Sequence, residues 1–306
     1  MPPQSASEAR PHLIPGAALW AWQQQAQQAA LTAGIEPQEL TWLLRALTDL
    51  APLHLRLGDY RTTAAIPSAL SLVELAQLWQ RRLQERVPVQ HLVGYTTWRQ
   101  FQLQVSPAAL IPRPETELFI DLALAACQAQ PELAKGAWVD LGTGSGAIAL
   151  ALANELPEAT IHAVDCSPAA LELARTNAAQ LHRTSRLHFW LGSWWQPLAA
   201  LAGQVSGAIA NPPYIPSDQI AQLQPEVACH EPRLALDGGA DGLQAVRQLI
   251  DTTPTYLQPG GFWAVELMVG QAPLVAELMT NQGDYEQITI HRDLAGRDRF
   301  VSARRR

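Results

Sequence analysis

Lysine is almost missing from this chain of 306 residues: Lys135 is the only one, and the formal net charge is −7. A protein that binds many phosphate groups usually presents a basic face, so we expect no direct binding of nucleic acid. Long hydrophobic runs are missing too, and none approaches the ~20 residues of a membrane span. The first residues also lack the apolar segment of a signal peptide. These absences favour a cytoplasmic protein that makes no contact with membranes.

Cysteine is scarce as well. The chain contains only Cys127, Cys166 and Cys229, and no two of them form a Cys-x-x-Cys pair. They predict neither a disulfide framework nor a zinc site. The neighbours Cys229, His230 and Glu231 cannot converge on one ion without a special loop, so we expect no metal.

The first 86 residues contain no group that suggests chemistry. Residues 1–16 are rich in proline and polar residues and are expected to form a disordered tail. Residues 17–86 indicate a small helical domain, in which Ser71 and Glu74 fit a capping box, and we expect this domain to bind the substrate protein. Residues 87–114 show short alternating runs between prolines, which predicts a hairpin-like connector.

From residue 115 to residue 306 the pattern alternates between strands and helices, after a first helix over 115–130. This alternation predicts an α/β domain in which a parallel sheet carries helices on both faces. The expected strands are 137–141, 160–164, 187–191, 207–210 and 261–266, with two last strands near 287–291 and 299–302.

A glycine-rich turn follows the first of these strands, directly after Asp140. Ligands of open α/β sheets bind at the carboxyl ends of the strands, so the turn is well placed for a cofactor. A dinucleotide fingerprint needs Gly-x-Gly-x-x-Gly, but here the third glycine comes one residue early. The spacing is similar to the S-adenosylmethionine loop of class I methyltransferases. The loop residues are Gly142, Thr143, Gly144, Ser145 and Gly146.

Two further side chains are candidates for the same cofactor. Asp165 ends the second expected strand, where a carboxylate can accept both ribose hydroxyls. The alternative is that Asp165 caps the helix beginning at Pro168, but Ser167 already fills that role. Trp194, just past the third strand, is suited to stacking against adenine, and an ordinary core tryptophan is the alternative.

The most informative segment is Asn211-Pro212-Pro213-Tyr214, which follows the apolar run of the fourth strand. Neither proline has a backbone N–H, and both rings stiffen the turn. The side-chain oxygen of Asn211 and the carbonyl of Pro212 can accept both hydrogens of one planar NH2 group, with Tyr214 over its face. This arrangement favours a clamp for an amide or aromatic amine that is to be alkylated. An Asx-type turn would explain Asn211 alone but not the rest.

Asn-Pro-Pro-Tyr at this position occurs in enzymes that methylate adenine, guanine or glutamine nitrogens. Other segments separate these enzymes, and here they resemble the release factor glutamine methyltransferase family (HemK/PrmC) over roughly residue 17 to the C-terminus. The resemblance implies a Rossmann-like class I methyltransferase sheet, mostly parallel with the last strand antiparallel, behind a small N-terminal helical domain. The segments are Val87–Gly94, Leu110–Glu117, Glu231–Gly242 and Asp293–Phe300.

The resemblance also implies roles for the motif residues. Residues 142–146, Asp165 and Trp194 would hold S-adenosyl-L-methionine, which leaves as S-adenosyl-L-homocysteine, and Asn211 would also contact this cofactor. The target would be the glutamine of the Gly-Gly-Gln motif in class I peptide chain release factors, so the enzyme would modulate translation termination, and we expect it to act as a monomer. The residues implied to hold the glutamine are Asn211, Pro212, Pro213 and Tyr214, with Asn211, Pro212 and Tyr214 catalytic.

Two positions depart from the family pattern. Ser193 stands where relatives often have an acidic residue, which puts one adenine contact in doubt, and Met268 stands where glycine is frequent. Several other functions remain open at this point. They are a ribosomal-protein glutamine methyltransferase, an adenine or guanine methyltransferase, a nicotinamide-dependent oxidoreductase, and a protein that binds S-adenosylmethionine without catalysis.

Overall fold

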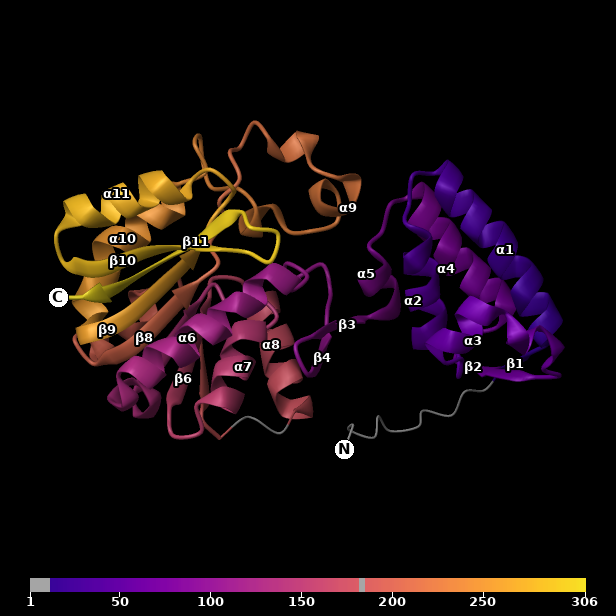
Figure 1. Ribbon diagram of the computed structural model, residues 1–306, viewed down its shortest axis with the longest axis horizontal. Helices are drawn as coiled ribbons and strands as arrows, with labels where there is room; N and C mark the ends of the chain where they lie inside the picture. Colours follow the sequence, from indigo (N-terminus) through magenta and orange to yellow (C-terminus); the bar gives the residue numbers. More distant parts are fainter. Residues whose placement is uncertain (1–11, 182–184) are drawn as a thin grey trace. The chain divides into compact units, whose positions relative to one another are not determined.

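The computed structural model describes residues 12–181 and 185–306, and the chain divides at Gly94 into two compact units (Figure 1). Each unit has a hydrophobic core of its own. Within the described residues, no helix is both long and apolar enough to cross a membrane.

The first unit is built mainly from helices, as its sequence predicts. Its core contains Leu19, Leu40, Leu75 and Trp79, all almost fully buried. The expected capping box is confirmed, because Ser71 and Glu74 exchange hydrogen bonds at the start of the fourth helix. The helices are α1 (Gly16–Thr32), α2 (Pro37–Leu47), α3 (Pro52–Leu57), α4 (Leu72–Gln84) and α5 (Val89–Val93), with a 3₁₀ turn, η1, at Asp59–Thr62.

The expected disordered tail is wrong for its last residues. Strand β1 (His12–Ile14) pairs antiparallel with β2 (Ile66–Ser68), and α1 begins at Gly16. The short strand is held because Ile14 is buried against the helical core. Residues 1–11 lie outside the described part of the chain.

The segment expected as one connector, 87–114, is shared between the units instead. Its first part forms α5, which belongs to the first unit. Its second part contains the hairpin of β3 (Tyr95–Trp98) and β4 (Phe101–Gln104). This hairpin belongs to the second unit, where the side chain of Asn177 bonds both the N–H and the carbonyl of Gln104.

The second unit contains a sheet of seven strands in the order β7-β6-β5-β8-β9-β11-β10. The last strand of the chain lies between two neighbours and runs antiparallel to both, whereas the other six are parallel. This confirms the expected Rossmann-like methyltransferase sheet. The strands are β5 (Ala137–Leu141), β6 (Thr160–Asp165), β7 (Leu187–Leu191), β8 (Val205–Ala210), β9 (Leu257–Glu266), β10 (Tyr285–Arg292) and β11 (Asp298–Arg305).

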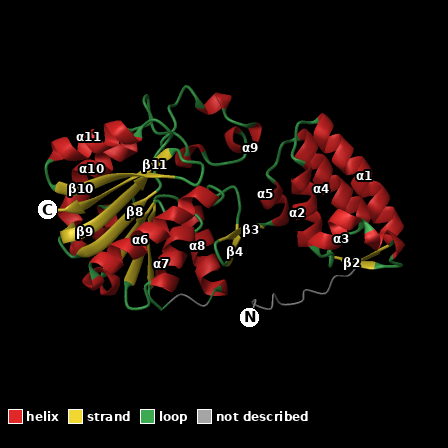
Figure 2. Cartoon of the chain, in the orientation of Figure 1, coloured by secondary structure: helices red, strands yellow, loops and turns green. Residues whose placement is uncertain are grey.

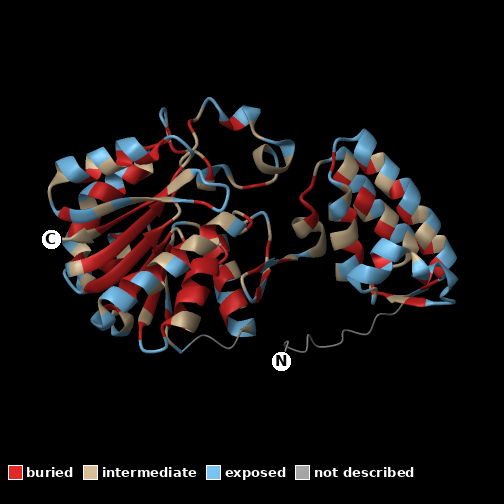
Figure 3. Cartoon of the chain, in the orientation of Figure 1, coloured by how far each residue is buried: buried red, intermediate tan, exposed pale blue. Residues whose placement is uncertain are grey.

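Helices cover both faces of this sheet, with α6, α7 and α8 on one face and α10 and α11 on the other (Figures 1 and 2). Side chains alternate along the strands, so Trp138 joins the first core layer and Val139 the second. The central strands are therefore buried, as Figure 3 shows. The helices are α6 (Leu118–Ala129), α7 (Ala147–Glu155), α8 (Pro168–Gln180), α10 (Gln244–Tyr256) and α11 (Ala272–Gln282), and the long loop before α10 carries the short α9 (Pro225–Ala228).

Candidate functional site

A cavity of about 260 Å³ opens at the carboxyl ends of β5, β6 and β8. In the sheet, β5 lies between β6 and β8, so the chain continues from β5 on one side and comes back to its other side later. The cavity therefore lies at the topological switch point, where ligands of such sheets bind. The predicted residues in its lining are Gly142, Thr143, Gly144, Ser145, Asp165, Trp194, Asn211 and Pro213.

The glycine turn is shaped by hydrogen bonds to the neighbouring strand. The N–H groups of Gly142 and Thr143 both donate to the carbonyl of Val164 at 2.9 Å. Gly142 and Gly146 have φ values of +80° and +85°, which only glycine adopts without strain. Within the described chain, Gly146 is the one residue of the predicted turn that does not line the cavity. It packs against α8, where an added Cβ would lie 3.1 Å from the Cβ of Ala174.

Asp140 supports this turn from below. Its side chain is fully buried, and its Oδ2 accepts hydrogen bonds from the hydroxyl of Thr143 at 2.6 Å and the N–H of Ala149 at 3.1 Å. Desolvation raises the pKa of Asp140 to about 7 against the effect of the Thr143 hydrogen bond. Within the described residues, its Oδ1 has no hydrogen-bond partner.

Asp165 ends β6 and faces the cavity. Its Oδ2 accepts the N–H of Gly144 at 2.9 Å, and its Oδ1 accepts the N–H of Ser167 at 2.8 Å. Burial raises the pKa of Asp165, while these hydrogen bonds lower it. Each carboxylate oxygen keeps further acceptor capacity for a ligand. The prediction that Ser167 caps α8 is confirmed, because its hydroxyl accepts the N–H of Ala170.

Trp194 lies beside the glycine turn with a φ of +50°, a strained conformation for a residue with a large side chain. A Cβ built on Gly142 would lie 3.4 Å from the Trp194 ring and 4.0 Å from the carbonyl oxygen of Asn211. The glycine turn, Trp194 and Asn211 therefore lie within van der Waals reach of one another at this position. Ser193 also lines the cavity.

The structure divides the Asn-Pro-Pro-Tyr segment into two parts. Within the described chain, the cavity lining includes Asn211 and Pro213 but neither Pro212 nor Tyr214. One face of the Tyr214 ring is covered by the guanidinium of Arg299, whose central carbon lies 5.4 Å from the ring centroid. Burial raises the pKa of Tyr214, so its hydroxyl stays protonated and is no base.

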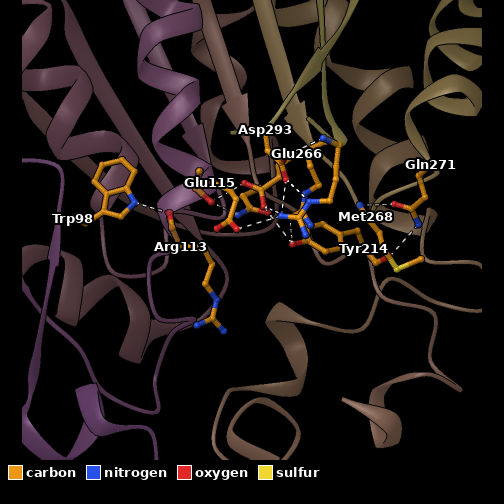
Figure 4. Close-up of polar contacts among 12 residues, drawn as sticks. Trp98, Arg113, Glu115, Tyr214, Glu266, Met268, Gln271 and Asp293 are labelled. Carbon is orange, nitrogen blue, oxygen red and sulfur yellow. Dashed lines mark hydrogen bonds and ion pairs between the residues drawn. The ribbon is translucent and has the colours of Figure 1, made fainter. Parts of the chain in front are cut away.

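Three residues that sequence reasoning did not select join both ends of this segment. The hydroxyl of Thr116 donates to Glu266 at 2.7 Å and accepts from the Nδ2 of Asn211 at 3.4 Å. Glu266 also accepts from the Tyr214 hydroxyl at 3.3 Å and from Arg299 at 2.8 Å. Figure 4 shows this network around Tyr214 and Glu266.

A detectable signal did exist for Glu266. It ends β9, and Asn211 follows β8 in the adjacent register, in which Ala210 pairs with Val265. Polar residues at neighbouring carboxyl ends of parallel strands are candidates for one site. Burial raises the pKa of Glu266, while the Thr116 hydrogen bond and the charge of Arg299 lower it.

The buried carboxylate of Glu231 joins two loops beside the cavity. Glu231, whose side chain is 1% exposed, forms an ion pair with Arg113 at 2.5 Å and accepts the N–H of Ile111. Arg113 lines the cavity, and its carbonyl accepts the indole N–H of Trp98 (Figure 4). The pair therefore fixes the segment before α6 against the loop before α10.

The carboxylates of this site do not form a metal centre. Within residues 12–181 and 185–306, no group of three or more His, Cys, Asp or Glu side chains could hold a metal ion.

Comparison with known proteins agrees with this geometry. The catalytic domain of hMettl16, solved with a MAT2A 3′UTR hairpin, covers 86% of the chain and 88% of its own length, with a TM-score of 0.53 and 14% identity, which shows a shared fold. Residues 121–228 match the family model of the methyltransferase small domain.

Curated relatives match almost the whole chain. The release factor glutamine methyltransferase of Synechocystis sp. is 55% identical over 92% of this chain and 95% of the relative. Those of Thermosynechococcus vestitus and Gloeobacter violaceus are 50% and 45% identical, covering 87% and 92% of this chain and 90% and 94% of the relatives. The chain belongs to the release factor glutamine methyltransferase family.

Proposed function

We propose that this protein transfers a methyl group from S-adenosylmethionine to the side-chain nitrogen of the Gly-Gly-Gln glutamine in class I release factors. The observation that carries the proposal is the Asn-Pro-Pro-Tyr segment at the end of β8, with Asn211 beside the glycine turn and Trp194. The names of its relatives support the choice of substrate.

The cavity residues suit S-adenosylmethionine. Asp165 offers a carboxylate with spare acceptor capacity for ribose hydroxyls, and Trp194 offers an indole surface for the adenine. At Gly142 and Gly144 the turn presents backbone without a side chain at the cavity wall.

The glutamine would be held through its amide NH2 group. The Oδ1 of Asn211 and the carbonyl of Pro212 would accept the two N–H groups and so fix the rotation of the amide. These acceptors also favour the positive charge that develops on nitrogen during attack.

The glycine turn, Asp165 and Trp194 would hold S-adenosylmethionine, which would supply a methyl group on a sulfonium sulfur that departs with the bonding electron pair. The target nitrogen would take this methyl group in place of one amide proton, which would pass to solvent. The chain's own contribution is orientation. Tyr214 stays protonated and donates to Glu266, so neither group is assigned as a base toward the substrate.

We further propose that the first unit binds the body of the release factor. Its surface has a groove of about 830 Å³ between α1, α2 and α3. The groove is lined by Trp20, Gln24, Trp42, Arg45 and Arg56.

The proposed reaction is tested with labelled S-adenosylmethionine and a class I release factor. We expect label on the native factor and none on a factor whose Gly-Gly-Gln glutamine is alanine. Asn211→Ala should bind the cofactor but lose transfer by at least about 100-fold, since positioning is the main catalytic effect. Label on the alanine factor, or on an oligonucleotide instead, would contradict the proposed substrate.

A further inference from the structure

The side chain of Asn211 ends a hydrogen-bond chain with a defined direction. Glu266 is fully buried and accepts from the hydroxyl of Thr116 at 2.7 Å. Because the Thr116 proton is used in this bond, its oxygen can only accept from Asn211, as the 3.4 Å contact with Nδ2 shows. The bond is long, as catalytic hydrogen bonds often are before a substrate binds.

The direction of this chain decides which atom of Asn211 remains free. A primary amide keeps almost the same shape when its oxygen and nitrogen change places. The change puts two N–H donors where the oxygen acceptor was. With its NH2 group on Thr116, Asn211 has its oxygen left as the second polar atom of the side chain, and Asn211 lines the cavity. The NH2 group of a substrate amide needs an acceptor at this position. An NH2 group of Asn211 turned toward it would place donors opposite the donors of the substrate.

The carboxylate that sets this direction is itself firmly held. Its Oε1 accepts from Arg299 at 2.8 Å and from the Tyr214 hydroxyl at 3.3 Å. Arg299 also donates to the Tyr214 hydroxyl at 3.0 Å. The carboxylate therefore has donors on both oxygens and is not free to turn away from Thr116.

We propose that Thr116 and Glu266 are positioning residues that lock the amide of Asn211 with its oxygen toward the target nitrogen. This inference rests on the proposed function, and it adds a source of specificity. The locked oxygen would favour glutamine, which presents N–H donors, over glutamate, which presents only acceptors. Both residues act on the substrate through the amide of Asn211.

The test compares Thr116→Val with Thr116→Ser in the full-length protein. Valine has nearly the shape of threonine but no hydroxyl, whereas serine keeps the hydroxyl. Glu266 itself is a poorer choice, because its removal leaves Arg299 as an unpaired buried charge. Binding of Gly-Gly-Gln and Gly-Gly-Glu peptides is measured by calorimetry with S-adenosylhomocysteine present, and the rate of methylation is measured on the Gly-Gly-Gln peptide.

With Thr116→Val we expect the preference for the glutamine peptide over the glutamate peptide to fall about 10-fold. The kcat should fall about 10- to 100-fold, while the Kd for S-adenosylhomocysteine stays unchanged. Thr116→Ser should restore both the preference and the kcat to within about threefold. Equal preference and kcat in the valine and serine variants would overturn the proposed lock. A wild-type protein that neither binds nor methylates the Gly-Gly-Gln peptide would instead overturn the proposed function.

Discussion

At the scale of single residues, this site depends on carboxylates buried where water cannot reach them. Asp140, Glu231 and Glu266 each accept hydrogen bonds that hold a loop or a side chain near the cavity. Burying a carboxylate costs free energy unless its partners compensate. Asp140 has the weakest compensation, since it has no cationic partner and one oxygen is left unpartnered within the described chain.

Asp140→Asn is therefore expected to stabilise the cofactor-free protein at alkaline pH. Burial holds the pKa of folded Asp140 at about 7, whereas the ordinary pKa of this side chain is 3.8. The folded state binds more protons in this window, so its stability falls as the pH rises from about 4 to 7. Asparagine removes this loss and can still accept from Thr143, so the gain at pH 8 should be on the order of 3 kcal/mol.

Urea unfolding of both proteins between pH 5 and pH 8 measures this difference. The gain should shrink toward pH 5, because Asp140 is protonated there. The exposed Asp251→Asn is the matched control for the removal of a carboxylate. A constant difference between Asp140→Asn and the wild type would show that Asp140 carries no desolvation cost.

The residues that follow strand ends were predictable from sequence because each follows its own strand. Asp165 and Asn211 both line the cavity, as expected because ligands of open α/β sheets bind at the carboxyl ends of the strands. Thr116 was not predictable as a partner of Asn211, because its contact depends on how α6 docks on the sheet. Thr116 and Glu266 lie 150 positions apart in sequence, and no local pattern joins them.

At the scale of elements, the close packing between the start of α7 and α8 controls the shape of the glycine turn. Gly146→Ala is expected to destabilise the protein and weaken cofactor binding. A positive φ costs alanine about 1–2 kcal/mol, and its Cβ would also press on Ala174 at 3.1 Å. Gly203→Ala is the control, because it has a φ of +72° with open space around it.

Chemical denaturation and calorimetric titration with S-adenosylhomocysteine separate the two effects. Both variants should lose the backbone contribution to stability, but only Gly146→Ala should bind the cofactor product more weakly. If the two variants lost stability equally and bound equally well, the close approach of the two helices would not matter to the site.

Several elements of the second unit were predicted well, whereas its last three strands were predicted too short. The strands 137–141 and 187–191 and the helix 147–155 match the structure residue by residue. The three-residue strand β1 was missed, because it forms only through pairing with β2 far along the chain. Short elements of this kind are set by tertiary contacts rather than by local propensity.

At the scale of the whole molecule, the chain combines one unit with a cavity at the strand ends and another with a surface groove. If the first unit binds the release factor, Arg45→Glu with Arg56→Glu should raise the KM for the whole factor about 10-fold. These side chains are exposed and line the groove, so charge reversal should leave folding intact. Methylation of a short Gly-Gly-Gln peptide should not change, because the peptide lacks the body of the release factor that the groove is proposed to bind.

Steady-state kinetics on both substrates measure the two effects. The exposed Arg61→Glu, outside the groove lining, is the control for reversing a charge on this unit and should leave both KM values unchanged. An equal rise for peptide and whole factor would contradict a docking role for the groove.

The position of β11 has a consequence for the order in which the site is completed. This strand follows β10 in the chain, yet it lies between β9 and β10 in the sheet and carries Arg299. During synthesis from the N-terminus, β9 and β10 therefore emerge before the strand that separates them. The hydrogen bonds from Arg299 to Glu266 and Tyr214 can form only once β11 has been inserted between its two neighbours.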